Sequence, residues 1–131
     1  AGTNAANDAS VIDNTTITRA GAGVRISNRA LVAISNSNIS LNNAVASTAA
    51  VSITAAVGGS VIDLENCQVN FNSVAIQPNA GNSIRLSNTH ITGNGAALNF
   101  NGGTIASYQN NRIAGNNSAE VFSSLTDFIQ N

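Results

Sequence analysis

A short pattern that recurs at a fixed interval constrains the fold of this chain more than any other feature. In each copy an asparagine is followed three residues later by isoleucine or valine, and a large apolar residue stands two positions before the asparagine. The repeated asparagines are Asn14, Asn36, Asn66, Asn88 and Asn110, separated by 22, 30, 22 and 22 residues. The chain therefore repeats a unit of 22 residues, and the longer interval predicts an eight-residue insertion within 42–50.

Each repeat holds three short segments in which apolar and polar residues alternate, as is typical of β-strands. In the third repeat they are 51–53, 61–64 and 69–71, and turn-forming glycine, asparagine and serine separate them. Three short strands in one repeat fit one turn of a solenoid, in which each strand pairs in parallel with its counterpart one coil away. The apolar side chains of these strands, Phe71 included, are then expected to point inward.

The repeated asparagines are expected to stack as a ladder at one corner of the coil. Asparagine tolerates the left-handed backbone of a sharp corner, and its amide can both donate and accept a hydrogen bond. A slip of one residue would break this ladder and turn the aliphatic side chains outward. A second asparagine follows in four copies, at Asn42, Asn72, Asn94 and Asn116, whereas the first copy has Ala20.

Four segments carry the pattern most clearly: "ISNSNISLN" (34–42), "LENCQVNFN" (64–72), "LSNTHITGN" (86–94) and "YQNNRIAGN" (108–116). In these the chain resembles the right-handed parallel β-helix of the pectin-lyase-like family, over roughly 10–122. Polysaccharide lyases, epimerases, phage tailspikes and bacterial surface proteins share that architecture, so the resemblance implies a fold rather than one activity. A left-handed β-helix would resemble an 18-residue hexapeptide repeat, and a leucine-rich repeat would need more leucine and a helical segment.

The two ends of the chain differ in apolar content. The C-terminal apolar residues have helical spacing, which predicts a short amphipathic cap over 123–131; one more partial coil is the alternative. These residues are Val121, Phe122, Leu125, Phe128 and Ile129. The polar segment 1–9 could cover little apolar surface. We therefore expect the first coil to contact a second copy, a partner, or the remainder of a longer chain.

The chain has few charged residues, and this low charge argues against some classes of partner. Only 8% of residues are charged, lysine is absent and the net charge is −1, which opposes nucleic acid as a partner. No apolar run approaches the roughly 20 residues of a membrane span. The lone Cys67 excludes an internal disulfide. It follows a repeated asparagine, where other copies carry hydroxyl or amide side chains, so we expect a turn residue without thiol chemistry.

No catalytic group, metal or cofactor is predicted. In enzymes that the chain resembles, the catalytic residues resemble a cluster of Asp, Arg or Lys on the outer face of the first strand column. The corresponding outward residues here would be Arg25, Ser52, Ala75, Asn99 and Glu120. Arg25 and Glu120 would lie about four coils apart, at ~4.8 Å per coil, and could not share a substrate atom. Asp63 and Arg85 are expected to be neighbours, as a surface ion pair.

A weak ligand-binding candidate lies on the third strand column. His90 is expected to face outward between Gln68 and Arg112, within a strip of uncharged polar residues that could hydrogen-bond sugar hydroxyls. A solvated histidine is the alternative, and one histidine without a second ligand makes a poor metal site.

The sequence thus predicts one all-β domain over 1–131. It is a single-stranded right-handed parallel β-helix of about five 22-residue coils, with an asparagine ladder and a short helical cap. The favoured function is a non-enzymatic structural or self-assembling module of an extracellular or surface protein. The alternative is a glycan-binding or polysaccharide-processing protein.

Overall fold

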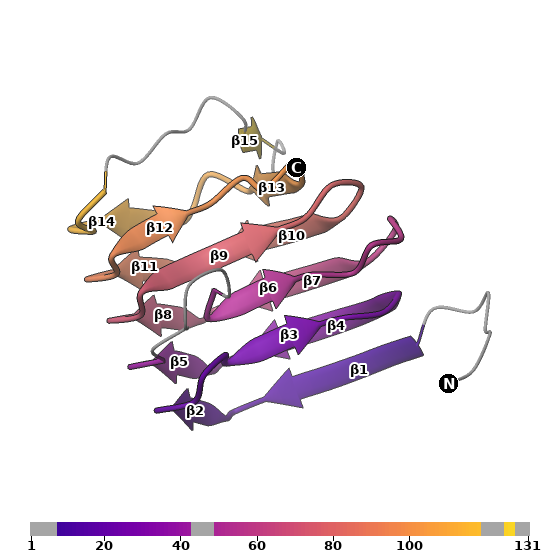
Figure 1. The fold of residues 1–131 in the computed structure, drawn as a ribbon. Helices are drawn as coiled ribbons and strands as arrows, with labels where there is room; N and C mark the ends of the chain where they lie inside the picture. The colour runs from indigo at the N-terminus through magenta and orange to yellow at the C-terminus, as the bar shows by residue number, and fades with distance from the viewer. Residues whose placement is uncertain (1–7, 43–48, 119–124, 128–131) are drawn as a thin grey trace.

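The computed structural model describes residues 8–42, 49–118 and 125–127. They form a solenoid of stacked coils with a parallel β-sheet along each of three sides (Figure 1). Sheet A contains, in order, β1 (Asp8–Asp13), β4 (Ala30–Ser35), β7 (Val61–Glu65), β10 (Ser83–Ser87), β13 (Thr104–Ser107) and β15 (Leu125–Asp127). Sheet B contains β2 (Thr16–Thr18), β5 (Asn38–Ser40), β8 (Gln68–Asn70), β11 (His90–Thr92) and β14 (Arg112–Ala114). Sheet C contains β3 (Val24–Ile26), β6 (Val51–Ile53), β9 (Val74–Pro78) and β12 (Ala96–Leu98).

The predicted all-β parallel solenoid is confirmed, because consecutive strands within each sheet come from consecutive coils. In sheet B, Ile39 pairs with Val69 and Val69 with Ile91, so the aliphatic residues of the repeat form one column. All three side chains are fully buried. Full burial of a side chain of this size contributes roughly 1.5–3 kcal/mol, so stacking like residues in register is the main driving force of the fold.

Each coil turns twice through a left-handed residue. The first corner, between sheets A and B, is made by Asn14, Asn36, Asn66 and Asn88, with φ between 44° and 53°. The second, after sheet B, is made by Arg19, Leu41, Phe71, Gly93 and Gly115, with φ between 56° and 70°. Phe71 is therefore not an inward strand residue as expected. It is 63% exposed, because the corner turns its side chain out of the core.

A buried asparagine ladder stands directly after the second corner. Here the side-chain oxygen of each asparagine accepts a bond from the main-chain N–H of the equivalent residue one coil earlier, always at 2.9 Å. The series of residues is Ala20, Asn42, Asn72, Asn94 and Asn116. Asn94 is fully buried, and its Nδ2 also donates to the carbonyls of Val69 and Thr92. These bonds satisfy main-chain groups that the corner leaves unpaired inside the protein.

The predicted first-corner ladder is exposed, and bonds between side chains join three of the five asparagines. Asn66 Nδ2 donates to Asn36 Oδ1 at 2.7 Å, and Asn88 Nδ2 donates to Asn66 Oδ1 at 3.1 Å. Below them, Asn36 Nδ2 donates to the Asp13 carboxylate at 2.9 Å. Above them, Asn110 Oδ1 accepts from the main-chain N–H of Asn88. The first corner therefore carries a second, solvent-facing ladder that ends on a carboxylate.

In the three middle coils, the residue after the first-corner asparagine is buried. Ser37, Cys67 and Thr89 occupy this column, and each donates to the main-chain carbonyl two residues earlier. Burial raises the pKa of the Cys67 thiol, although nearby main-chain hydrogen bonds oppose the change. The thiol thus takes the structural place of a hydroxyl at an inner corner.

The fifth coil departs from the expected 22-residue register. Sheet A pairs Ile84 with Ile105 and Leu86 with Ser107, an offset of 21 residues, whereas sheet B pairs His90 with Arg112. Tyr108 is thus not the apolar residue equivalent to Leu86, and Gln109 rather than Asn110 has the left-handed backbone, with φ of 65°. The first corner of this coil holds one additional residue, which restores the register in sheet B.

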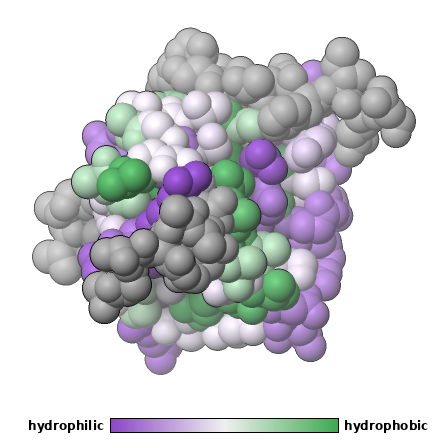
Figure 2. Space-filling model, turned by 90° about the vertical axis from the view of Figure 1, so that its right-hand side faces the viewer, coloured by the Kyte–Doolittle hydropathy of each residue, from purple (hydrophilic) through white to green (hydrophobic). Residues whose placement is uncertain are grey.

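The insertion is divided between two turns rather than confined to 42–50. Sheet C pairs Val24 with Val51, so part of the extra length lies before β6, where 43–48 are outside the described residues. The rest lies between β6 and β7, in a turn whose Val57 is 67% exposed. Figure 2 shows this side of the molecule, where hydrophobic groups gather near the middle and hydrophilic groups lie beside them.

The predicted C-terminal helix is wrong where the structure describes it. Residues Leu125–Asp127 form β15, which pairs in parallel with β13 from Ile105 to Ser107. The other residues of the expected cap, including Phe122 and Phe128, lie outside the described residues. The edge of β13 has unpaired main-chain N–H and C=O groups. Residues 125–127 form hydrogen bonds with these groups and so become a strand of a further coil.

A candidate binding groove on sheet B

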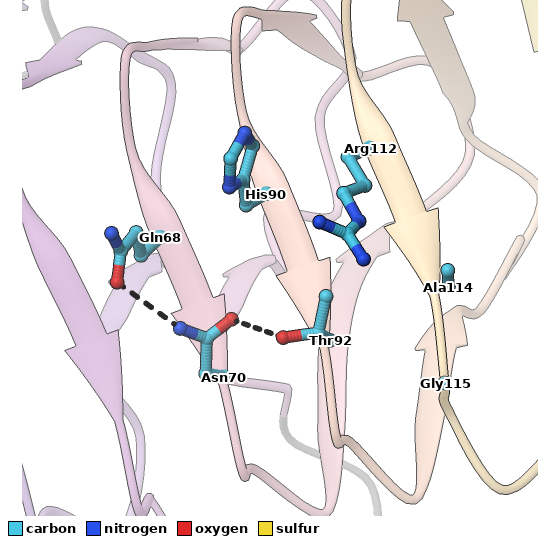
Figure 3. Close-up of a pocket in the computed structure, with 7 residues that line it drawn as sticks. All are labelled: Gln68, Asn70, His90, Thr92, Arg112, Ala114 and Gly115. Atoms are coloured by element: carbon cyan, nitrogen blue, oxygen red, sulfur yellow. Dashed lines mark hydrogen bonds between the residues drawn. The ribbon is translucent and has the colours of Figure 1, made fainter.

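The outer face of sheet B holds a groove of about 430 Å³ toward its C-terminal strands (Figure 3). Its lining comes from β8, β11 and β14 and consists of Gln68, Asn70, His90, Thr92, Arg112, Ala114 and Gly115. Alternation along each short strand turns every second side chain away from the core, so the middle aliphatic residue points inward and its two neighbours line the groove. Gly115 adds the corner after β14.

The three predicted ligand-binding residues lie side by side in this groove. Gln68 pairs with His90 and His90 pairs with Arg112, on neighbouring strands at about 4.8 Å spacing. In Figure 3 the His90 ring stands out from β11, and the Arg112 guanidinium points toward that strand. All three residues are exposed, so the parallel register presents them together to solvent.

A chain of hydrogen bonds along the same face cannot be read from the sequence pattern. Thr92 Oγ1 donates to Asn70 Oδ1 at 3.0 Å, and Asn70 Nδ2 donates to Gln68 Oε1 at 3.4 Å. The repeated polar positions indicate that these residues share a face, but side-chain orientation decides which atoms bond. These bonds link the outward side chains of β8 and β11 and orient Gln68.

A second hollow of about 200 Å³ adjoins the groove toward the N-terminal coils. The two share Gln68, and the second one is lined by Asn14, Thr15, Thr16, Asn36, Ser37, Asn38 and Gln68. Among the residues that the structure describes, neither lining contains aspartate or glutamate. The sheet-B face is thus a continuous polar strip, with His90 and the positively charged Arg112 at one end.

The outer face of sheet C differs from the expected arrangement. Val51 pairs with Ile76 and Ser52 with Gln77, so Gln77 rather than Ala75 follows Ser52 in the outward column. Ala75 is fully buried, and Ser52 and Gln77 are buried as well. Glu120 lies outside the described residues. Within 8–42, 49–118 and 125–127, no three His, Cys, Asp or Glu side chains are grouped as metal ligands.

The predicted neighbours Asp63 and Arg85 form an ion pair on sheet A. Their closest atoms, Arg85 Nη1 and Asp63 Oδ1, are 3.6 Å apart, and both side chains are about half-exposed. Solvent screening leaves such a pair with little effect on the free energy of unfolding.

Comparisons with protein-family models, curated proteins and solved structures give no match to this chain. In the described part of the chain, no helix has the length and apolar character that crossing a lipid bilayer requires.

Proposed function

We propose that this chain is a non-enzymatic structural module, a right-handed pectin-lyase-like β-helix that serves an extracellular or cell-surface protein. The observation that supports this proposal is the buried asparagine ladder, which joins successive coils through bonds of equal length. Because each coil repeats the same corner and fills the same column, the length of the rod follows the number of coils. Such a rod is suited to act as a spacer or a scaffold.

The same geometry provides a surface for self-assembly. Among the described residues, β1, β2 and β3 are the terminal strands of the three sheets and belong to one coil. Terminal strands present unpaired N–H and C=O groups, to which parallel strands of another copy or of a longer chain can add. A head-to-tail contact of this kind does not close on itself, so it produces filaments.

Negative-stain electron microscopy over a concentration series tests self-assembly. We expect filaments one solenoid wide that lengthen as the protein concentration rises. A matched variant, Val57→Lys, carries a charge in the turn between β6 and β7, away from the terminal strands, where Val57 is 67% exposed. That charge opposes lateral association but leaves the strand edges free, so the variant should form the same filaments. Dispersed particles of one size at every concentration would count against the proposal.

The groove on sheet B supports a second candidate function, binding of a glycan. The supporting observation is that Gln68, His90 and Arg112 line one hollow together. A glycan-binding screen with the wild type and the double variant His90→Ala/Arg112→Ala tests it. We expect binding by the wild type and its loss in the variant, with unchanged circular dichroism. Equal binding by both proteins would place the glycan elsewhere.

A further inference from the structure

The hydrogen-bonding groups of the groove are not balanced between donors and acceptors. The two amide oxygens in its lining, Gln68 Oε1 and Asn70 Oδ1, already accept bonds from Asn70 and Thr92, respectively. In the described residues, no protein acceptor pairs with Gln68 Nε2, the His90 ring or the Arg112 guanidinium, whereas the Arg85 guanidinium has a carboxylate partner. The groups left for a ligand are therefore mainly donors, and one of them carries a permanent positive charge.

We propose that this groove binds an oxyanion, a carboxylate or sulfate, with the Arg112 guanidinium as its principal contact and Gln68 Nε2 and His90 beside it. A guanidinium presents several N–H groups in a plane that match two oxygens of such an anion. The described lining residues include no carboxylate, so an anion meets no repulsion from them. The inference rests on the second proposed function and adds the charge of the ligand to it.

The single histidine of the chain makes the test direct, because every histidine ring signal in an NMR spectrum belongs to His90. The ring protons are followed at constant pH and ionic strength while one probe is added: sodium acetate, sodium sulfate, sodium glucuronate or glucose. Glucose is the neutral counterpart of glucuronate. We expect saturable shifts with the oxyanions and none of comparable size with glucose. The oxyanion with the lowest Kd shows whether the groove prefers a simple carboxylate, a sulfate or the carboxylate of a sugar acid.

Two variants and a control connect these shifts to the groove. Arg112→Gln should raise the Kd of the best oxyanion about tenfold, since a hydrogen bond to a charged group is lost. Gln68→Glu keeps the oxygen that Asn70 uses and replaces the donor with a negative charge, so it should also weaken binding. Arg25→Gln removes the same charge as the first variant from an exposed position on sheet C and should leave the Kd unchanged.

The possible failures can be told apart. Equal shifts with glucose and glucuronate, unaffected by Arg112→Gln, would overturn the oxyanion inference and leave glycan binding intact. No shift with any probe, together with no binding in the glycan screen, would overturn both. Equal weakening in Arg25→Gln and Arg112→Gln would assign the effect to net charge and also overturn the inference.

Discussion

At the scale of single residues, asparagine has two different roles in this protein. At the first corner it supplies the left-handed backbone, and its side chain lies at the surface, as in Asn66 and Asn88. After the second corner it is buried, as in Asn72 and Asn94, and completes the hydrogen bonding of main-chain groups. The second role carries more of the stability, because an unpaired buried polar group costs more than a lost surface bond.

Asn94→Ala should therefore lower the free energy of unfolding by about 2–4 kcal/mol, since several buried main-chain groups lose their partner. The matched control is Asn88→Gly, which keeps the left-handed corner and removes an exposed side chain, and it should cost less than about 1 kcal/mol. Urea denaturation monitored by circular dichroism measures both. Similar losses in the two variants would contradict the different roles of the two ladders.

Asp13 gives the first corner a dependence on pH. Hydrogen bonds from Ser35 and then Asn36 lower the pKa of its carboxyl below the ordinary value for aspartate. A carboxyl whose pKa is lower in the folded than in the unfolded state stabilises the protein at any pH above its unfolded-state pKa. This stabilisation is lost as the pH falls through the folded-state pKa. The wild type should lose stability below about pH 4, and Asp13→Asn should lose less over that range. Parallel urea midpoints for the two proteins from pH 5 to about 2.5 would contradict this.

At the scale of elements, the turn that leads from sheet B into sheet C sets how closely two coils approach. Gly95 lies in this turn before β12, and a Cβ atom there would stand 2.5 Å from the main-chain oxygen of Ser73, one coil earlier. The main-chain bond from Gly95 N to Asn72 O fixes that distance. The coils meet here through backbone rather than side chains, so the position requires glycine.

Gly95→Ala should destabilise the protein by about 1–3 kcal/mol, because the coils must separate locally to admit the methyl group. Gly21 belongs to the turn from sheet B to sheet C of the first coil, and a Cβ there meets nothing within 4 Å. Gly21→Ala should thus be neutral or slightly stabilising. Thermal unfolding of both variants tests this prediction. Equal melting temperatures would contradict it, because they would show that the backbone near Ser73 can move to admit the methyl group at little cost.

At the scale of the whole molecule, the protein is a linear stack in which each coil contacts mainly its neighbours. The strand pairs connect coils in sequence order within all three sheets, so a middle coil is supported from both sides. In such a stack the free energy of local opening is expected to vary along the chain, lowest near the outer coils and highest in the middle.

Amide hydrogen exchange should follow this gradient. We expect the slowest exchange at Val69 and Ile91 in the third and fourth coils, and faster exchange at Ile17 in the first. The buried Cys67 provides a second probe, since alkylation of its thiol requires opening of the third coil. Uniform protection across these positions would instead indicate that the solenoid opens only as one cooperative unit.

The groove on sheet B and the second corner show which features the sequence predicts and which it does not. The equal spacing of Gln68, His90 and Arg112 was sufficient to place them side by side, because parallel pairing brings equivalent residues of successive repeats together. The donor-rich character of the groove was not predictable, since it depends on how Asn70 and Thr92 orient their side chains. Alternation also cannot distinguish the last residue of a strand from a corner residue, so the pattern predicts an inward Phe71, which the structure places at an exposed corner.

The sequence alone determined the parallel solenoid, its period and the column of aliphatic residues, because these follow from a repeat that only stacking can satisfy. The tertiary structure decided the register of the fifth coil, where filling the core with Ile105 outweighs the local resemblance of Tyr108 to Leu86. It also decided that 125–127 form a strand, because the free edge of β13 pairs with them. Both outcomes depend on contacts between residues far apart in the chain, and a local pattern does not contain them.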